Sequence, residues 1–249
     1  MDQKAIAKAA LLIKKSKYTI AFSGAGISVE SGIPPFRGEK GLWTKYDPNI
    51  LDINTYLNRP HESWPAIKAL FYDFLGKAKP NLAHIKLAEL EKVGLMKEII
   101  TQNIDNLHQK AGSHFVHEFH GRLSHFICTK CSRYYVANDL LLTKQPPYCK
   151  LASCKALLKP DFVFFGEGIS EHIYESSLLA VSKAKVMLII GASGDVMPAA
   201  SLPEIAKSKG CAIVEINPEI SSFTRRITDV FIQSKASEGL KALAAILEL

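Results

Sequence analysis

The chain has 249 residues, of which 47% are hydrophobic and 22% charged, a composition typical of a globular protein with a substantial core. Its apolar runs, such as residues 186–190 and 212–214, are too short to span a bilayer, and residues 1–10 lack the apolar region of a signal peptide. We therefore expect an intracellular, cytoplasmic protein with no membrane partner. The net charge of +7 is spread along the chain, and its densest run, residues 14–17, favours a solvated helix face over a nucleic-acid site.

The predicted elements alternate between helices and buried strands. Apolar residues at helical spacing predict a helix over residues 4–15, and residues 19–22 then read as a short buried strand that ends on glycine. Further buried strands are predicted at residues 98–101, 186–190 and 211–216, separated by helical patterns at 81–93, 171–183 and 202–208. This alternation predicts an α/β fold with a doubly wound, mainly parallel, Rossmann-like sheet that is covered on both faces. Ligands of such sheets bind beyond the C-terminal ends of the strands.

Two segments interrupt that alternation. Residues 41–80 are rich in aromatic residues, Pro and Asn and contain helical pieces such as residues 64–75, and residues 123–157 contain a cysteine cluster. Both read as insertions that together form a smaller domain. The predicted division is a larger nucleotide-binding domain over residues 1–40, 81–122 and 158–249, and a small helical and cysteine-rich domain over residues 41–80 and 123–157.

A glycine-rich loop, Ser23-Gly24-Ala25-Gly26, follows the first predicted strand. A strand, such a loop and a helix start present backbone N–H groups to a pyrophosphate. The third glycine of a dinucleotide fingerprint is replaced by Val29, so a simple strand-to-helix turn stays an equal alternative. The following Pro34-Pro35 cannot continue a helix, and the resulting loop places Phe36 and Arg37 near the phosphates unless it is only a surface loop.

Polar residues follow the second predicted strand. Residues 101–105 (Thr-Gln-Asn-Ile-Asp) stand where ligands gather, although Asn103 and Asp105 are also common helix-capping residues. His120 lies just before the cysteine segment, and its imidazole would suit acid–base chemistry near neutral pH. Five of the eight histidines fall between His108 and His125, so position alone does not separate a catalytic histidine from a structural one.

Four cysteines form two pairs. Cys128 and Cys131 have two intervening residues, and Cys149 and Cys154 have four. Two such pairs separated by residues 132–148 predict a structural zinc ribbon, with disulfides as the lesser alternative in an intracellular protein. Cys211 falls within a predicted strand and reads as a core residue.

These blocks, in this order, resemble the sirtuin (Sir2-type) family of NAD-dependent protein-lysine deacylases, from about residue 17 to the end of the chain. The resemblance implies that His120 is the catalytic base, assisted by Asn103, and that the cysteines hold one structural Zn²⁺. It also implies acyl-lysine peptides as partners. The peptide would pair with residues 160–167, through Val163, Phe164, Gly166 and Glu167.

The resemblance further implies an extended NAD site. Phe36 and Arg37 would belong to a loop over the cofactor, Gln102 and Asn103 would line the nicotinamide ribose, and Asp105 would bind the carboxamide. The full set of implied cofactor contacts is Gly24, Ala25, Gly26, Ser28, Phe36, Arg37, Gln102, Asn103, Ile104, Asp105, Gly191, Ala192, Ser193, Asn217, Pro218, Glu219 and Ala236. Ala192 replaces the threonine usual in the family motif, and Glu215 beside Asn217 is a further candidate for the adenosine ribose.

The implied products are nicotinamide, O-acyl-ADP-ribose and free lysine. Family members that prefer succinyl or malonyl groups carry a Tyr-x-x-Arg pair, whose positions here hold Lys68 and Phe71. One lysine lacks the fork geometry of arginine, so we expect apolar acyl groups to be favoured. Two alternatives remain: protein mono-ADP-ribosyl transfer, which shares the first half of the mechanism, and a non-catalytic zinc-ribbon binding module.

Overall fold

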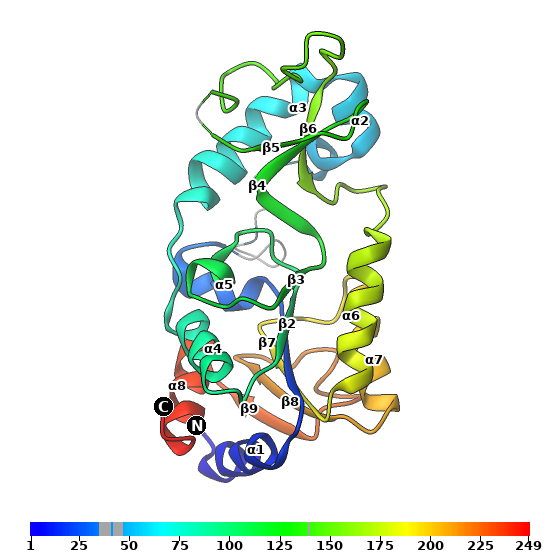
Figure 1. Ribbon diagram of the computed structural model, residues 1–249. Coiled ribbons are helices and arrows are strands. Elements are labelled where there is room, and N and C mark those ends of the chain that lie inside the picture. The colour runs from blue at the N-terminus through cyan, green and yellow to red at the C-terminus, as the bar shows by residue number, and fades with distance from the viewer. Residues whose placement is uncertain (35–40, 42–46, 139) are drawn as a thin grey trace.

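The computed structural model describes residues 1–34, 41, 47–138 and 140–249, and it divides into a larger lower part and a smaller upper part (Figure 1). Both chain termini lie at the lower end, beside α1 (Gln3–Lys15) and α8 (Ala236–Ile246), far from the upper part. Within the described ranges, no helix is long and apolar enough to cross a membrane.

The larger part contains a six-stranded sheet in the order β3-β2-β1-β7-β8-β9, with every neighbouring pair parallel. The strands are β1 (Thr19–Ser23), β2 (Glu98–Thr101), β3 (Val116–Glu118), β7 (Val186–Ile190), β8 (Ala212–Asn217) and β9 (Val230–Gln233). The parallel sheet is thus confirmed, with β2 and β7 at their predicted bounds and β8 beginning one residue late. The strands β3 and β9 at the two edges were not predicted, because they are short and incompletely buried.

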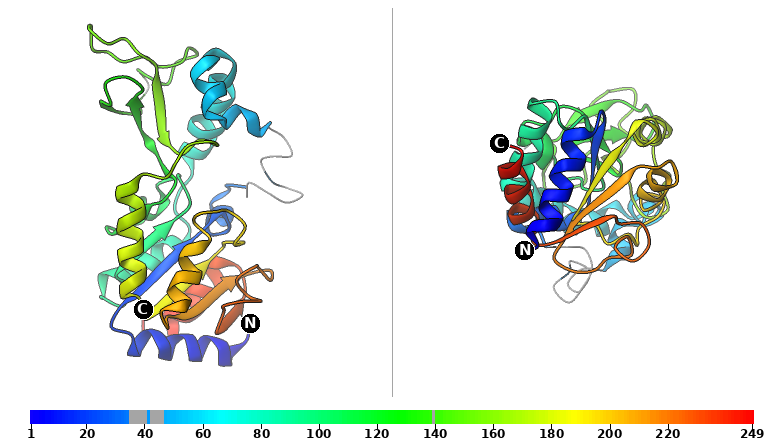
Figure 2. Two further views of the ribbon diagram at one scale, coloured as in Figure 1. Left: turned by 90° about the vertical axis from the view of Figure 1, so that its right-hand side faces the viewer. Right: turned by 90° about the horizontal axis from the view of Figure 1, so that it is seen from below.

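Helices cover both faces of this sheet, as expected for a doubly wound fold. On one face, α1, α4 (Leu82–Lys92) and α8 enclose an aliphatic core with the strands. On the other face lie α6 (Glu171–Lys183) and α7 (Ser201–Ser208), and Figure 2 shows the two layers from two further sides. The helices predicted at 4–15, 81–93, 171–183 and 202–208 are confirmed within one or two residues.

Asn81 explains where α4 begins and how it holds a neighbouring loop. Its side-chain oxygen accepts a hydrogen bond from the N–H of Ala83, which satisfies a free donor of the first turn. Its amide nitrogen donates to the carbonyl oxygen of Ile27 at 2.7 Å and to the hydroxyl of Ser31 at 3.0 Å. One capping residue therefore starts α4 and also fixes the segment that follows the glycine loop.

The smaller part combines a helical segment with a three-stranded antiparallel sheet. The sheet has the order β5-β4-β6. Its strands are β4 (Gly121–Cys128), β5 (Tyr134–Val136) and β6 (Leu158–Phe162), and its helical segments are η3 (Pro48–Leu51), α2 (Ile53–Asn58), α3 (Pro60–Ile67), the π-helix η4 (Lys68–Phe74) and η5 (Leu75–Lys77). Aromatic rings fill the core: the rings of Tyr72 and Phe126 stack at 5.4 Å, and Trp64 lies 5.9 Å from each. The smaller part is therefore helical, as expected, and it also contains a three-stranded sheet that was not predicted strand by strand.

One of the connections between the two parts runs through the start of β4 (Figure 1). Gly121 has a φ of +77°, and a Cβ there would lie 2.3 Å from the carbonyl oxygen of Asp161. Arg122 lies between Asp161, 3.1 Å away, and Glu118 at the end of β3, 3.8 Å away. The predicted division places residues 158–162 in the larger domain, whereas this strand pairs with β4. The domain bounds stay a prediction.

Candidate functional site

The glycine loop lies at the C-terminal edge of the sheet and packs against the loop that follows β7. The N–H of Gly24 donates to the carbonyl oxygen of Ile190 at 3.1 Å, and the N–H of Gly26 donates to that of Gly191 at 2.9 Å. A Cβ on Gly26 would lie 2.6 Å from the Cα of Gly191. These two glycines are thus required by the approach of the two loops, and their N–H groups are used within the protein rather than presented to a phosphate.

A short 3₁₀ helix, η1 (Ala25–Ser31), follows the glycine loop in place of an α-helix. It ends at Gly32, whose φ of +86° is the left-handed conformation that glycine adopts without strain. Ser28 lies inside η1 and is fully buried. The tight 3₁₀ winding turns its hydroxyl toward the residues after β2, where the polar cluster stands.

Ser28, Asn103 and Asp105 form one buried hydrogen-bonded group. The hydroxyl of Ser28 donates to Oδ2 of Asp105 at 2.7 Å, and Nδ2 of Asn103 donates to Oγ of Ser28 and to the carbonyl oxygen of Gly24, both at 3.1 Å. The N–H of Leu107 donates to Oδ1 of Asp105 at 2.9 Å, so this carboxylate satisfies the first N–H of α5 (Leu107–Lys110), whose N-cap residue is Asn106. Burial raises the pKa of Asp105, although these hydrogen bonds oppose the shift.

His120 is half-buried between the end of β3 and the start of β4. Its Nδ1 lies 3.0 Å from the carbonyl oxygen of Gln102, an atom that only accepts hydrogen bonds. In the neutral ring Nδ1 must therefore carry the proton, which leaves Nε2 with a free lone pair. Burial lowers the pKa of His120, and the bond to Gln102 only partly offsets this, so the ring is neutral at pH 7.

A second buried network lies behind these residues and was not predicted. The hydroxyl of Ser23 donates to Oγ1 of Thr101 and lies 2.8 Å from Nε2 of His108, whose ring meets that of His84 edge to face at 5.0 Å. Burial lowers the pKa of His84 to about 4 and that of His108 to about 3. His84 lies within the predicted helix at 81–93 and His108 is one of five clustered histidines, so no local pattern indicated that the two rings meet.

The predicted peptide-binding segment starts at the end of β6. The N–H of Val163 donates to the carbonyl oxygen of His120 at 2.9 Å, which ties the segment to the predicted base. Phe164 is buried, and Gly166 is exposed with a φ of +88°. The carboxylate of Glu167 accepts from Nζ of Lys159 at 3.0 Å and from the N–H of Phe164 at 2.8 Å, so its side chain shapes this turn internally.

The loops after β7 and β8 bring the remaining predicted contacts to the same edge. Ala192 is buried in the apolar core, and its carbonyl oxygen accepts a hydrogen bond from Nδ2 of Asn217 at 3.1 Å. Gly191 is half-buried, Ser193, Pro218 and Glu219 are exposed, and Ala236 begins α8. Glu215 is completely buried and faces hydroxyl groups of its own loop, which contradicts its suggested contact with a ribose.

The four cysteines converge at the far end of the small part. Their sulfur atoms all lie within 4.8 Å of one another, with Cys128 to Cys154 at 3.5 Å and Cys131 to Cys149 at 3.8 Å. A regular tetrahedron with Zn–S bonds of about 2.3 Å has edges of about 3.8 Å, so the set fits one Zn²⁺ ion. All five cysteines are free of disulfides, which contradicts the disulfide alternative.

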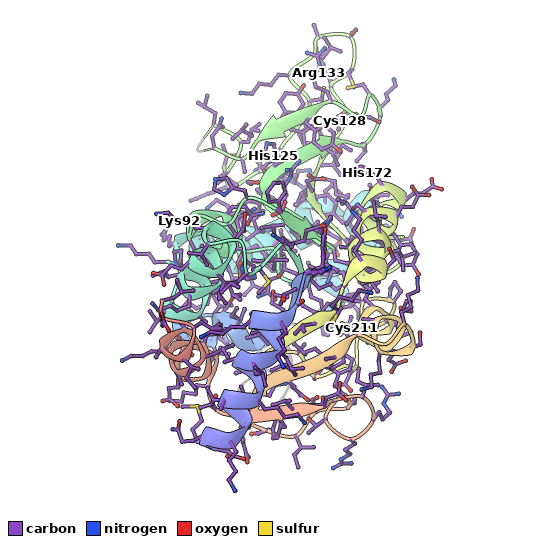
Figure 3. All side chains as sticks on the ribbon, turned by 60° about the horizontal axis from the view of Figure 1, so that its bottom comes forward. Lys92, His125, Cys128, Arg133, His172 and Cys211 are labelled. Atoms are coloured by element: carbon purple, nitrogen blue, oxygen red, sulfur yellow. The ribbon has the colours of Figure 1, made fainter. Side chains whose placement is uncertain are left out.

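The electrostatics of the cluster agree with a thiolate site. Burial opposes ionisation of Cys128, but backbone N–H groups of Cys131 and Lys130 outweigh it and lower the pKa of the Cys128 thiol to about 6. The phenol of Tyr135 lies 3.0 Å from Sγ of Cys149. Cys211 lies apart from this cluster, in the larger part beside the sheet, as Figure 3 shows with Cys128 labelled at the opposite end. It is buried, as expected for a core residue.

Phe36 and Arg37 lie outside the described residues. Phe71 is fully buried against Phe162, with ring centroids 5.0 Å apart. Lys68 donates to both carboxylate oxygens of Asp73, at 2.7 and 2.8 Å, a pairing of residues five apart that suits the wider turn of the π-helix.

Comparison with known proteins gives a consistent result. The model of the Sir2 family matches residues 24–198. A protein of Pyrococcus furiosus named NAD-dependent protein deacylase is 45% identical over 238 residues, which cover 93% of this chain and 94% of that protein. An NAD-dependent protein deacetylase of Thermotoga maritima is 40% identical over 209 residues, covering 83% and 84% of the two chains.

Solved structures agree with this match. A Sir2 homologue in complex with NAD superimposes with a TM-score of 0.89 at 39% identity, covering 97% of this chain and 93% of that chain. A Sir2 complex with a p53 peptide and NAD⁺ superimposes with a TM-score of 0.88 at 34% identity, covering 100% and 99%. Sequence, fold and the residues at the sheet edge thus lead to one conclusion: the chain belongs to the Sir2 family.

Proposed function

We propose that this chain is an NAD-dependent protein-lysine deacylase that releases nicotinamide, O-acyl-ADP-ribose and free lysine. The observation that carries the proposal is the state of His120. Its Nδ1 is held by the carbonyl oxygen of Gln102, so Nε2 is available as a base beside the buried group of Asn103 and Asp105. The curated relatives named as NAD-dependent protein deacylases, at 40–45% identity, support the same assignment.

His120 would act on the ribose hydroxyls of NAD. In the first half-reaction the acyl oxygen of the substrate bonds to C1′ of the nicotinamide ribose as the C1′–nicotinamide bond breaks. Nε2 of His120 then takes the proton of a ribose hydroxyl, so that the 2′-oxygen can bond to the acyl carbon. The acyl group leaves on ADP-ribose, and water supplies the atoms that release free lysine. A low pKa keeps His120 ready to accept that proton at neutral pH.

We propose roles for the remaining site residues from their positions at the C-terminal edge of the sheet. The absence of side chains at Gly24, Gly26 and Gly191 lets the glycine loop and the loop after β7 pack closely, at the edge of the sheet where we place the pyrophosphate. Gln102 and Asn103 would line the nicotinamide ribose, and Asp105 would bind the carboxamide. The outer contacts proposed for the phosphates and adenosine are Ser193, Asn217, Pro218, Glu219 and Ala236, with Phe36 and Arg37 over the cofactor.

The acyl-peptide would lie along residues 163–167, with its backbone paired as an added strand. The anchoring of this segment to His120 and Glu167 supports the proposal, because it sets the peptide backbone at a fixed distance from the base. The Sir2 structure that contains a p53 peptide and NAD⁺ has the same fold, which is consistent with peptide substrates here. The zinc ion would hold the small part together and take no part in the chemistry.

We also propose that apolar acyl groups are preferred over succinyl and malonyl groups. Lys68 forms an ion pair with Asp73, so its charge is already compensated. Phe71 adds an apolar ring in place of the guanidinium that would pair with an acyl carboxylate.

Mass spectrometry of NAD with a panel of acyl-lysine peptides tests both proposals at once. We expect nicotinamide and O-acyl-ADP-ribose from acetyl and longer apolar peptides, and no O-acyl-ADP-ribose from His120→Ala, because His120 acts after nicotinamide has left. Efficient desuccinylation would overturn the acyl preference. ADP-ribose attached to a target protein, without O-acyl-ADP-ribose, would instead establish mono-ADP-ribosyl transfer.

A further inference from the structure

Glu215 is a carboxylate buried at the end of β8 without a cation. It is 0% exposed, and no ion pair with it occurs among the described residues. Oε1 accepts hydrogen bonds from Nδ2 of Asn217 at 2.8 Å and from the hydroxyl of Ser221 at 2.5 Å. Oε2 accepts from the hydroxyls of Thr224 at 2.8 Å and Thr228 at 2.7 Å. Four neutral donors make burial of this charge tolerable, and they tie the β8–β9 connection to the sheet.

The hydrogen bond that Asn217 donates to Glu215 helps to fix the orientation of the Asn217 side-chain amide. Its Nδ2 has two hydrogens, one bound to Glu215 and the other to the carbonyl oxygen of Ala192 at 3.1 Å. A flipped amide would place an oxygen against these two oxygens, so this rotamer is strongly preferred. Among the described residues none donates to Oδ1 of Asn217, and this atom is not enclosed. The carbonyl oxygen of the amide therefore faces outward at the C-terminal edge of the sheet.

We infer that Glu215 is a positioning residue that holds Asn217 as a pure hydrogen-bond acceptor for the adenosine ribose, and thereby selects NAD over its 2′-phosphorylated form. The inference rests on the proposed placement of adenosine beside Asn217. A 2′-hydroxyl can donate to the outward Oδ1. A 2′-phosphate has no such donor at its bridging oxygen and carries a charge of about −1.5 to −2, which the oxygens of Asn217 and Glu215 repel.

Isothermal titration of NAD and NADP into purified protein tests this without relying on catalysis. We expect Glu215→Met, which keeps the volume and removes the acceptors, to weaken NAD binding about tenfold, the effect of one lost hydrogen bond. Asn217→Ala should weaken NAD binding by a similar factor. The double variant should be no weaker than either single variant, because Glu215 acts through Asn217. NADP should bind at least tenfold more weakly than NAD to the wild type, and both single variants should narrow that difference.

Two further variants separate positioning from structural support. Glu215→Gln can keep an oxygen toward Asn217 and should retain most of the NAD affinity. Glu98→Gln is the matched control, since Glu98 is another carboxylate held by side-chain hydrogen bonds, to Tyr18 and His117, but at the start of β2 on the opposite edge. It should lower the melting temperature and leave the KM for NAD and the KM for the acyl-peptide unchanged.

If Glu215→Met does not fold, a pair of variants that reverses the direction of the Asn217–Glu215 hydrogen bond serves as the test instead. Asn217→Asp puts an oxygen against Glu215 and should weaken NAD binding, and adding Glu215→Gln should restore part of the loss, because the new amide can donate to the new carboxylate. Wild-type affinity for NAD in a folded Glu215→Met, additive losses, or equal binding of NAD and NADP would overturn the inference, even if the protein deacylates peptides. NAD binding that follows the expected pattern without nicotinamide release would leave the inference standing and overturn the proposed reaction.

Discussion

The two parts of the molecule are stabilised by different means. In the larger part, six parallel strands pair along their backbones and aliphatic side chains fill both layers between sheet and helices. The smaller part has a three-stranded sheet, a core of packed aromatic rings and four converging thiols. Four thiolates on one ion would cross-link segments of the smaller part that are far apart in the chain. We therefore expect the larger part to fold by its own core and the smaller part to depend on zinc.

Removal of zinc should have the largest effect, and it should destabilise the smaller part while leaving the larger part folded. Structural zinc contributes about 10 kcal/mol or more to the folding of small zinc domains. We expect a chelator, or Cys131→Ser, to abolish hydrogen-exchange protection in β4 and β5 and to abolish deacylation, while β7 and β8 stay protected. Cys211→Ala is the matched control, because this thiol is free and lies in the larger part. Equal loss of protection in both sheets would show that the two parts form one cooperative unit.

His120→Ala should have the next largest effect, and only on chemistry. A general base contributes about 10²- to 10⁴-fold to the rate, and we expect kcat to fall by that factor. The melting temperature and the affinity for NAD should change little, because the side chain makes one hydrogen bond and is half-buried. A large fall in melting temperature instead would mean that the residue mainly connects the two parts.

The pH dependence of stability should distinguish the two parts as well. His84 and His108 are buried neutral in the larger part with pKa values of about 4 and about 3, below the usual 6.5. The unfolded chain therefore binds more protons below pH 6.5, so stability is lost as pH falls from about 6.5 toward 4. We expect a loss of a few kcal/mol in urea unfolding at pH 4.5 relative to pH 7. His108→Gln should flatten this dependence, and an unchanged slope would contradict the assignment.

The rate of catalysis should follow a different pH profile. His120 acts only when neutral, and burial lowers its pKa. We expect kcat/KM to stay constant from pH 8 down to pH 6.5 and to fall only at lower pH, with a midpoint below 6.5. A midpoint at or above 6.5 in initial-rate measurements would mean that the ring is more solvated during turnover than in this structure.

Gly26→Ala should have a smaller effect, localised to the edge of the large sheet. The new Cβ would lie 2.6 Å from the Cα of Gly191, so the two loops must separate. We expect a loss of about 1–3 kcal/mol in stability and weaker binding of NAD. Gly168→Ala is the control, since nothing lies within 4 Å of a Cβ there. Equal effects of the two substitutions on the Kd for NAD would refute the role of the loop contact.

Asp73→Ala should have the smallest effect. It removes the partner of Lys68 and leaves that ammonium group uncompensated. We expect activity on succinyl peptides to rise relative to activity on acetyl peptides, because Lys68 is then free to attract the acyl carboxylate. The rise should be only about a few fold, because an exposed ion pair contributes little free energy in water. An unchanged ratio of the two activities would show that Lys68 does not reach the acyl group.

Much of this arrangement could be predicted from the sequence, for identifiable reasons. Buried runs such as residues 98–101 and 186–190 are short, apolar and bounded by polar residues, and they appear as β2 and β7 at those bounds. The edge strand β9 carries a weaker pattern and was missed. The cysteine spacing predicted the convergence of four thiols because a tetrahedral site restricts which spacings can close.

Other features depend on tertiary contacts that no local pattern encodes. The Gly24 and Gly26 N–H groups donate to the β7 loop, nearly 170 residues away, and this could not be read from a glycine motif. Glu215 looked like a ligand because it stands two residues before Asn217, but hydroxyl groups of the β8–β9 connection enclose its carboxylate, and these contacts form only in the folded chain. The pairing of His84 with His108 joins two helices that meet only in the folded chain.

The position of the two chain ends has a practical consequence. Both lie beside α1 and α8 at the lower end of the molecule, while the C-terminal edge of the sheet faces the smaller part (Figure 1). A fluorescent label, an affinity tag or a surface tether attached at either end would therefore stand away from the sheet edge and from the proposed peptide-binding segment at residues 163–167. Immobilised protein should keep free access for both nucleotide and peptide, which makes it suited to single-molecule recording.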